Sequence, residues 1–552
     1  MAQARILPLN PSRRPAANAP DPQRLKLLRA LERKILWLSS WMIHHANQVR
    51  PRRDGLKVGG HQASSASSVT LLTALYLHAL RSEDRVAVKP HASPVFHAIQ
   101  YLLGRQTVDN LKRFRALGGA QSYPSRTKDI DDVDFSTGSV GLGVAATLFA
   151  SIVQDYVQLK RLAPAEAKRG RMVAIVGDAE FDEGNVFEAL LEGWKHDVRN
   201  LWWVIDYNRQ SLDSVVSDHL FQTIERAFEG TGWRVVTLKY GKLLEEAFRQ
   251  PGGAALRRWI DECPNAIYSA LCYKGGAAWR EHMRAEIGQE PGVAELLARY
   301  NDDDALHRLM TNLAGHDLES IVEAFDAASA DDTPTCFIAY TIKVQGLPFA
   351  GHKDNHSGLM TLEQMAQFKK GMGIADGAEW DKFAGLGATA PELEAFLKQA
   401  PFNQAGRRRT EAPAVAIPAA LPAPKDRESS TQAGFGQNSS INSLYSAAGY
   451  NEETYVRAFT RHEFALPMGD DVVHFAPFLQ GTGIGYMLND FQDYAGPDRP
   501  GGTFRGILGG GARMSAEFAQ NFDGVQSSTL DLNRMRWRSE EHTSELQSPY
   551  VI

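Results

Sequence analysis

Short apolar runs that end in polar residues alternate with helix-like segments in the first part of the chain. The run Met172 to Val176 is followed by Asp178, and the run Leu201 to Ile205 is followed by Asn208. Between the two runs, residues 185 to 194 have the apolar spacing of a helix. Apolar runs of this length, bounded by turn residues, are typical of buried strands. The pattern therefore predicts a βαβ unit with two parallel strands.

The same alternation continues on both sides of this unit. Gln23 to Val49 carries leucines at helix-face spacing, which predicts a long packed helix. Residues 144 to 153 form another apolar, helix-like segment, and residues 336 to 340 read as a further buried strand. Strands separated by helices predict an α/β fold with a central, mostly parallel sheet flanked by helices.

Polar side chains follow the two strands of the βαβ unit. Asp178 offers a carboxylate, Asn208 an amide oxygen, and the chain around Gln210 a backbone carbonyl. Parallel strands end at one edge of the sheet, where open α/β folds bind ligands, and Mg²⁺ prefers hard oxygen ligands completed by phosphate and water. We interpret the cluster as a Mg²⁺-diphosphate site. A simple solvated acidic loop, including Glu180 and Glu183, is the alternative.

Gly177 to Asn208 resembles the thiamine diphosphate signature of the transketolase superfamily. That signature begins Gly-Asp-Gly and ends in a pair of asparagines about one βαβ unit later. Two departures are visible in this chain, because Ala179 replaces the third residue of the signature and Asp206 stands where the first amide usually lies.

Further motifs resemble one branch of that superfamily, the homodimeric bacterial type of pyruvate dehydrogenase decarboxylating component. The resemblance covers roughly Leu31 to Gly371 and does not cover the rest of the chain. Its motifs occur in the family's order: GGHQASSASS (Gly59 to Ser68), KPHASP (Lys89 to Pro94), FSTGSVGLG (Phe135 to Gly143), GGAAWREHM (Gly275 to Met283), GHD (Gly315 to Asp317), TIKVQG and KDNH (Thr341 to His356).

The resemblance implies the site residues. Mg²⁺ would be held by Asp178, Asn208 and Gln210. Thiamine diphosphate would be contacted by Gly138, Val140, Gly141, Gly177, Ala179, Glu180 and Asn208. The implied catalytic residues are His61, His91, Lys343 and His356, the last on a loop that helps the acyl group pass to its acceptor. The residues alone leave other interpretations open, because a lone histidine is often structural and residues 345 to 358 also read as a polar surface loop.

Composition is that of an ordinary intracellular enzyme. The chain has 552 residues, 43% of them hydrophobic, and a formal net charge of −5 with acidic and basic residues interspersed. We therefore expect neither a nucleic-acid partner nor, for residues 1–430, a membrane. The three cysteines are widely spaced, and the N-terminus lacks a secretory profile, which favours a cytoplasmic location.

Changes in composition divide the chain. Residues 1–22 are Pro-rich and predict a disordered arm, residues 23–405 the thiamine diphosphate domain, and residues 406–430 a Pro/Ala linker. Residues 431–537 read as an incomplete or foreign segment of β-hairpins, because residues 512–518 alternate strictly between apolar and polar positions and Gly-rich turns recur. As a whole, residues 444–537 are similar to part of an outer-membrane β-barrel. Residues 538–552 resemble a translated sequencing adapter. We thus expect a truncated or chimeric second half.

Residues 430–436, by contrast, resemble the opening helix of the pyrimidine-binding domain that follows the linker in the family. In that family a glutamate of the partner subunit's pyrimidine domain activates the cofactor. No counterpart of this glutamate is evident after Gly436.

Three functions follow from these observations. The first is the thiamine diphosphate and Mg²⁺ dependent decarboxylating component of a 2-oxo acid dehydrogenase, acting on pyruvate as a homodimer with a lipoyl-bearing acyltransferase as partner. The second is a transketolase that moves a two-carbon ketol unit between sugar phosphates. The third is an inactive fragment that only anchors the cofactor.

Overall fold

A computed structural model of the chain divides into two compact units, Met1–Glu411 and Ala412–Ile552, which we call the first and second units. In the first unit it describes residues 20–51, 57–162, 168–211, 214–215, 220–352, 355 and 358–404. In the second unit it describes the backbone of seven strands between residues 428 and 537. The predicted arm, most of the predicted linker and the predicted tail 538–552 lie outside the described residues.

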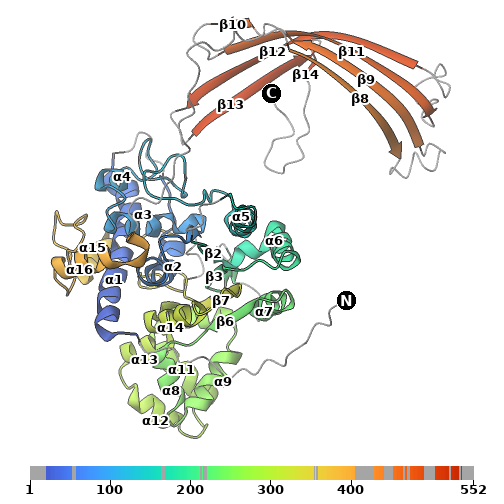
Figure 1. Ribbon diagram of the computed structural model, residues 1–552. Coiled ribbons are helices and arrows are strands. Elements are labelled where there is room, and N and C mark those ends of the chain that lie inside the picture. The colour runs from blue at the N-terminus through green and yellow to red at the C-terminus, as the bar shows by residue number, and fades with distance from the viewer. Residues whose placement is uncertain are drawn as a thin grey trace. The chain divides into compact units, whose positions relative to one another are not determined.

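The first unit is built on a five-stranded sheet in the order β1-β2-β3-β7-β6. All four strand pairs are parallel, which confirms the predicted α/β class (Figure 1). The strands are β1 (Arg85–Ala87), β2 (Met172–Gly177), β3 (Leu201–Tyr207), β6 (Arg234–Leu238) and β7 (Thr335–Tyr340), and a short antiparallel pair, β4 (Gln210–Ser211) and β5 (Ser214–Val215), follows β3.

The predicted βαβ unit is present as β2, helix α6 (Gly184–Lys195) and β3. One detail of the prediction was wrong. The second strand was expected to end before Asp206, but β3 runs on through Tyr207, and Asp206 pairs with Gly177 of β2 and Ala339 of β7. The strand continues because a carboxylate is accepted inside the sheet when buried polar partners satisfy it, and Asp206 has such partners.

Helices cover both faces of the sheet. The face that contains Trp202 and Phe337 is covered by α1 (Pro22–His44), α2 (Gln62–Ala74), α3 (Ser93–Leu102), α14 (Leu318–Ala328), α15 (Leu362–Gly371) and α16 (Ala390–Gln399). The face that contains Trp203 and Ile338 is covered by α5 (Leu142–Leu159), α6, α7 (Leu220–Gly230), α8 (Lys242–Phe248), α9 (Gly253–Glu262), α10 (Asn265–Lys274), α11 (Gly276–Ile287), α12 (Val293–Arg299) and α13 (Asp303–Met310).

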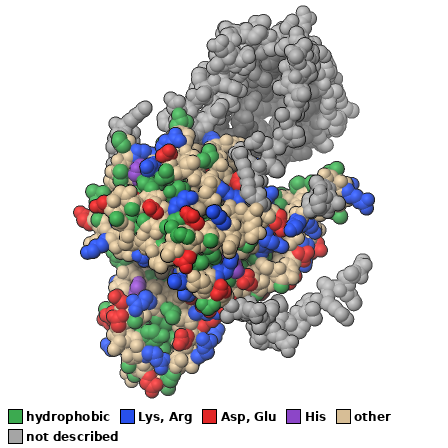
Figure 2. All heavy atoms as spheres, turned by 60° about the vertical axis from the view of Figure 1, so that its left-hand side comes forward, with side chains coloured by type: hydrophobic (Ala, Val, Ile, Leu, Met, Phe, Trp, Pro, Cys, Tyr) green, Lys and Arg blue, Asp and Glu red, His purple; other side chains and the backbone are tan. Residues whose placement is uncertain are grey.

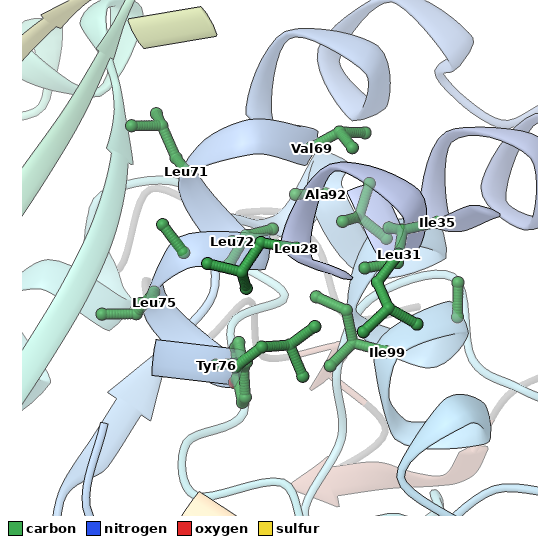
Figure 3. Packing of buried hydrophobic residues seen from close by; sticks show 14 of the residues in the cluster. Leu28, Leu31, Ile35, Val69, Leu71, Leu72, Leu75, Tyr76, Ala92 and Ile99 are labelled. Atoms are coloured by element: carbon green, nitrogen blue, oxygen red, sulfur yellow. The ribbon is translucent and has the colours of Figure 1, made fainter. Parts of the chain in front are cut away.

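Local sequence explains where these helices begin and how they pack. Pro22 opens α1, and the carboxylate of Asp21 accepts a hydrogen bond from the Gln23 amide at 3.1 Å, a standard helix start. The predicted helix 23–49 is confirmed, since α1 continues as a π-helical turn, His45–Val49. In Figure 3, Leu28 and Leu31 of α1 lie against Leu72 of α2 and Ile99 of α3.

A buried ion pair fixes helix α3 to the loop that follows it. His97 and Asp131 are fully buried, with His97 Nδ1 2.8 Å from Asp131 Oδ2 and Nε2 3.1 Å from the Gln121 carbonyl. Burial alone would lower the pKa of His97, but the charge of Asp131 outweighs burial and raises this pKa to about 9.

This pair predicts a loss of stability at alkaline pH. The pKa of His97 in the folded state lies above its ordinary value of 6.5, so its stabilisation is complete below pH 6.5 and is lost as pH rises through about 9. We expect the free energy of unfolding of wild type, relative to His97→Gln, to fall by roughly 3 kcal/mol across that window. Urea unfolding from pH 6 to pH 10 measures the difference, and a pH-independent difference would contradict the ion pair.

Helices α5 and α6 present an apolar face to solvent. They pack side by side, and each leaves large apolar side chains 46% to 82% exposed: Leu142, Phe149, Val153, Tyr156 and Leu159 on α5, and Phe187, Leu191 and Trp194 on α6. Among the described residues, α5 is also the one helix with the length and hydropathy of a membrane span, by composition alone. Elsewhere on the first unit, Figure 2 shows acidic and basic side chains interspersed.

The second unit is an antiparallel sheet in the order β14-β13-β12-β11-β9-β8, with β10 beside β11. The strict alternation at residues 512 to 518 correctly predicted a strand, because it lies within β12. The expected helix at residues 430–436 is wrong, since two glycines in this segment disfavour a helix and its backbone pairs with β9 throughout. The strands are β8 (Glu428–Ser439), β9 (Glu452–Glu463), β10 (Leu466–Met468), β11 (Val473–Asn489), β12 (Phe504–Gln520), β13 (Gly524–Asn533) and β14 (Arg536–Trp537).

Candidate functional site

The three residues predicted to hold Mg²⁺ come together at the carboxyl edge of the sheet. Asp178 follows β2, and Asn208 and Gln210 follow β3. The Asp178 carboxylate accepts a hydrogen bond from the Arg209 amide at 2.8 Å, and Asn208 Oδ1 accepts one from the Gln210 amide at 3.1 Å. Arg209 adopts a left-handed conformation with φ of 66°, which makes the turn that returns the chain toward Asp178. The geometry therefore gathers a carboxylate, an amide oxygen and a backbone turn.

The Asp178 carboxylate lies in an environment that suits a cation. Its side chain is 3% exposed, and burial, assisted by the negative charge of Asp206, raises the pKa of Asp178 to about 7. Lys89 and the amides of Arg209 and Ala179 act in the opposite direction. A buried anion destabilised in this way gains from a divalent cation beside it. The donor set, all hard oxygens, is the type that Mg²⁺ prefers.

Glu180 joins the two loops whose backbone the resemblance assigns to the cofactor. Its carboxylate accepts hydrogen bonds from the Gly177 amide at 2.9 Å and from the Gly141 amide at 2.8 Å. Gly141 has φ of 75°, and a Cβ there would lie 2.7 Å from Asn185 Oδ1, so a side chain does not fit. Glu180 thus holds the start of α5 against the strand end of β2.

The remaining predicted cofactor contacts surround this junction. Gly138 and Val140 are exposed on the segment that leads into α5, whereas Gly141 is buried. Ala179 is half-buried in the short helix η4 (Asp178–Asp182), next to the carboxylate. A helix start is a common place for a diphosphate to bind.

The two histidines predicted to be catalytic stack on each other. The rings of His61 and His91 lie 3.9 Å apart between centroids and 22° from parallel. His61 stands at the start of α2, and His91 lies in the short helix η3 (Pro90–Ala92). The His91 carbonyl accepts a hydrogen bond from Ser65 Oγ of α2 at 3.2 Å. Two motifs thirty residues apart in sequence therefore form one cluster.

Lys343 lies on the turn after β7 and is 3% exposed. The next residue, Val344, has φ of 70°, which is rare and strained for a β-branched residue. Its amide bonds to the Ala63 carbonyl at 3.3 Å, which ties this turn to the helix that begins after His61. Local strain held by tertiary contacts is typical of functional sites. His356, the fourth predicted catalytic residue, lies outside the described residues.

Sequence reasoning missed the partners of Asp206. The carboxylate is fully buried and lies 2.5 Å from Lys89 Nζ and 2.6 Å from Ser67 Oγ, and it also accepts a hydrogen bond from Thr341 Oγ1. Burial would raise the pKa of Asp206, but Lys89 and the hydroxyl donors hold this pKa below its ordinary value. No local signal reveals the pairing, because Lys89 and Asp206 are 117 residues apart.

His316, within the GHD motif, is a second residue for which no role was predicted from the sequence. Its Nε2 accepts a hydrogen bond from the Ile342 amide at 2.7 Å, and its Nδ1 is buried without a partner. Burial lowers the pKa of His316 to about 4, so the ring is neutral near pH 7. With Nε2 accepting, Nδ1 carries the proton and is a donor that a ligand could satisfy.

Comparison with known proteins finds one matching family and several relatives. Residues 79–249 match the family described as "Transketolase, thiamine diphosphate binding domain". The chain is 30% identical over 403 residues to the pyruvate dehydrogenase E1 component of Cupriavidus necator, which corresponds to 69% of this chain and 43% of that protein. It is 29% identical over 356 residues to the Escherichia coli pyruvate dehydrogenase E1 component, 62% of this chain and 38% of that protein.

Among solved structures, a transketolase from Leishmania mexicana matches with a TM-score of 0.47 and 15% sequence identity, over 69% of this chain and 45% of that chain. The chain therefore spans less than half the length of the curated relatives given above.

Proposed function

Because the chain carries a thiamine diphosphate binding domain of the transketolase family, we propose that it anchors thiamine diphosphate through Mg²⁺ for the decarboxylation of a 2-oxo acid, with pyruvate as the substrate. The observation that supports this most directly is the buried Asp178 carboxylate beside the Asn208–Gln210 turn. The pyruvate assignment rests on the similarity to pyruvate dehydrogenase E1 components.

Different residues of this chain would bind the metal and position the backbone for the diphosphate. Asp178, Asn208 and the backbone carbonyl at Gln210 would hold Mg²⁺, and Glu180 would keep the backbone at Gly141 and Gly177 in place for the diphosphate. Bound thiamine diphosphate supplies the electron sink that decarboxylation of a 2-oxo acid requires.

The histidine cluster would act on the substrate. The His61 and His91 rings are close enough that positive charges on both would repel each other. A neutral imidazole can accept or donate a proton at a reacting carbonyl or carboxylate. Lys343 and the neutral His316 lie on neighbouring turns, with the Nδ1 proton of His316 available for a hydrogen bond.

Two partners follow from the same proposal. A second copy of the chain would cover the apolar face of α5 and α6, since apolar area of this kind on a globular unit commonly marks an interface. A lipoyl-bearing acyltransferase would take the acyl group, in keeping with the dehydrogenase complexes to which E1 components belong.

A cofactor anchor without turnover is the second candidate function, and the length comparison favours it. The chain covers 43% of the Cupriavidus necator protein, so groups that lie in the remainder of such a protein have no counterpart in the matched region. Under this alternative the chain binds Mg²⁺ and thiamine diphosphate but needs another polypeptide for catalysis.

One experiment separates these functions. We expect calorimetry on the 552-residue chain to detect thiamine diphosphate binding with Mg²⁺, and at least about tenfold weaker binding with EDTA in its place. Turnover of pyruvate with an artificial electron acceptor would support the dehydrogenase component. Binding without turnover would support the anchor alone, preference for xylulose 5-phosphate would support a transketolase, and no binding would overturn the proposal.

A further inference from the structure

Asp206 occupies a central position in the site although the Mg²⁺ ligands do not include it. Strand register places it beside Gly177, one residue before Asp178. Its side chain is 0% exposed, so its charge must be satisfied by protein groups. Three groups do this, and each comes from a different segment.

These three segments carry the predicted catalytic residues. Ser67 lies on α2, which starts after His61. Lys89 stands two residues before His91. Thr341 stands two residues before Lys343. A single carboxylate in β3 therefore fixes three catalytic segments against the sheet, through contacts of 2.5 Å to Lys89 and 2.6 Å to Ser67 and a further bond from Thr341.

Charge explains why Lys89 is one of the partners. A second carboxylate beside Asp178 would on its own make the site more negative, and the negative charge of Asp206 is indeed one cause of the raised pKa of Asp178. The Lys89 ammonium, 6% exposed, cancels that charge at 2.5 Å. Asp206 stands where the family signature usually has an amide. The ion pair of Asp206 and Lys89 has no net charge, and in this respect it matches the neutral amide.

We infer that Asp206 is a positioning residue of the cofactor site, and that Lys89 is its matched counter-charge, so that the two act as one neutral unit. Asp206 aligns the segments of His61, His91 and Lys343. The positive charge of Lys89 offsets the effect of the Asp206 charge on the electrostatic potential at Asp178. The first half of this inference concerns packing alone, and the second half rests on the proposed function.

A double-mutant cycle tests the pairing without any cofactor. The four proteins are wild type, Asp206→Asn, Lys89→Gln and the double variant, in which an amide pair of similar shape replaces the ion pair. Each single variant leaves a buried charge unpaired, so we expect each to lower the melting temperature. The loss of melting temperature in the double variant is expected to be well below the sum of the two single losses. Additive losses would overturn the pairing. A single variant that fails to fold while the double variant folds would support it.

Mg²⁺ titration then tests the role at the site. We measure the Mg²⁺ concentration that half-saturates thiamine diphosphate binding, at a temperature below every melting transition. Asp206→Asn leaves the Lys89 cation unopposed near Asp178 and is expected to raise this concentration by about tenfold. Lys89→Gln leaves an extra anion and is expected to lower it, and the double variant should return close to wild type.

Opposite signs for the two single variants distinguish an electrostatic role from a structural one, because a purely structural loss would raise the Mg²⁺ requirement in both. Changes in the same direction would overturn the role at the site. Failure of wild type to bind thiamine diphosphate would refute the proposed function instead, and the melting cycle would still decide whether Asp206 and Lys89 are paired.

Discussion

Replacing Asp178 by alanine is expected to abolish Mg²⁺-dependent thiamine diphosphate binding, with a loss of affinity of about 100-fold or more. Asp178 supplies the one carboxylate among the three proposed Mg²⁺ ligands, and its position against the Arg209 amide fixes it at the strand edge. Asp178→Asn is a second variant that preserves shape and removes charge, and it should lose nearly as much. Calorimetry with and without Mg²⁺ measures both losses.

The control for this prediction is Asp182→Ala, which removes an exposed acid from the same short helix η4. It should bind thiamine diphosphate like wild type.

The stability of the unligated protein provides a second test of the buried Asp178 charge. Because the pKa of Asp178 is raised to about 7, its buried charge reduces stability as pH rises from about 4 through 7. Unligated Asp178→Asn should therefore be at least as stable as wild type at pH 8. Unchanged cofactor affinity in Asp178→Ala would show that the metal site is elsewhere.

The second large effect is expected on oligomeric state. Val153 and Leu191 lie on the exposed face of α5 and α6, with side chains 58% and 47% exposed. Introducing a glutamate at both positions places charges where a second copy would pack, and burying unpaired charges there opposes association. We expect wild type to sediment as a dimer at micromolar concentration and Val153→Glu/Leu191→Glu to sediment as a monomer.

A matched control keeps this test specific. Leu243 on α8 is 46% exposed, close to the 47% of Leu191, but α8 lies apart from α5 and α6 (Figure 1). Leu243→Glu should leave the dimer intact. A monomeric wild type, or a variant that stays dimeric, would contradict the proposed interface. Binding of the monomeric wild type to lipid vesicles would instead identify α5 as a membrane-contacting helix, the other use to which its length and hydropathy are suited.

The sequence predicted the parts of the fold that depend on local pattern. Apolar runs identified β2, β3 and β7, and spacing identified α1 and α6, because period and turn residues are properties of neighbouring positions. The placement of Asp178 beside Asn208 was also predictable, since it follows from parallel strands joined by a helix. The assigned roles of His61, His91 and Lys343 came from the resemblance, and they remain predictions.

Contacts between distant segments could not be predicted in this way. Glu180 was expected to contact the cofactor, with a solvated acidic loop as the alternative, but its bond to Gly141, 39 residues away, and its burial had no local signal. The charge on Asp206 looked like a departure from a signature, and its compensation by Lys89 became visible only in three dimensions. The helix expected at 430–436 failed because that expectation came from the resemblance, which ends before this segment.

The proposed Mg²⁺ ligands follow two different strands, which has a consequence for the order of assembly during folding. Asp178 and Asn208 become neighbours only after β2, α6 and β3 have docked in register. Under the proposed function, the cofactor would have no binding site on a partly folded chain and would not act as a template for the early steps. The cofactor would bind only after the sheet has formed. Added Mg²⁺ and thiamine diphosphate should therefore slow unfolding while leaving the refolding rate unchanged.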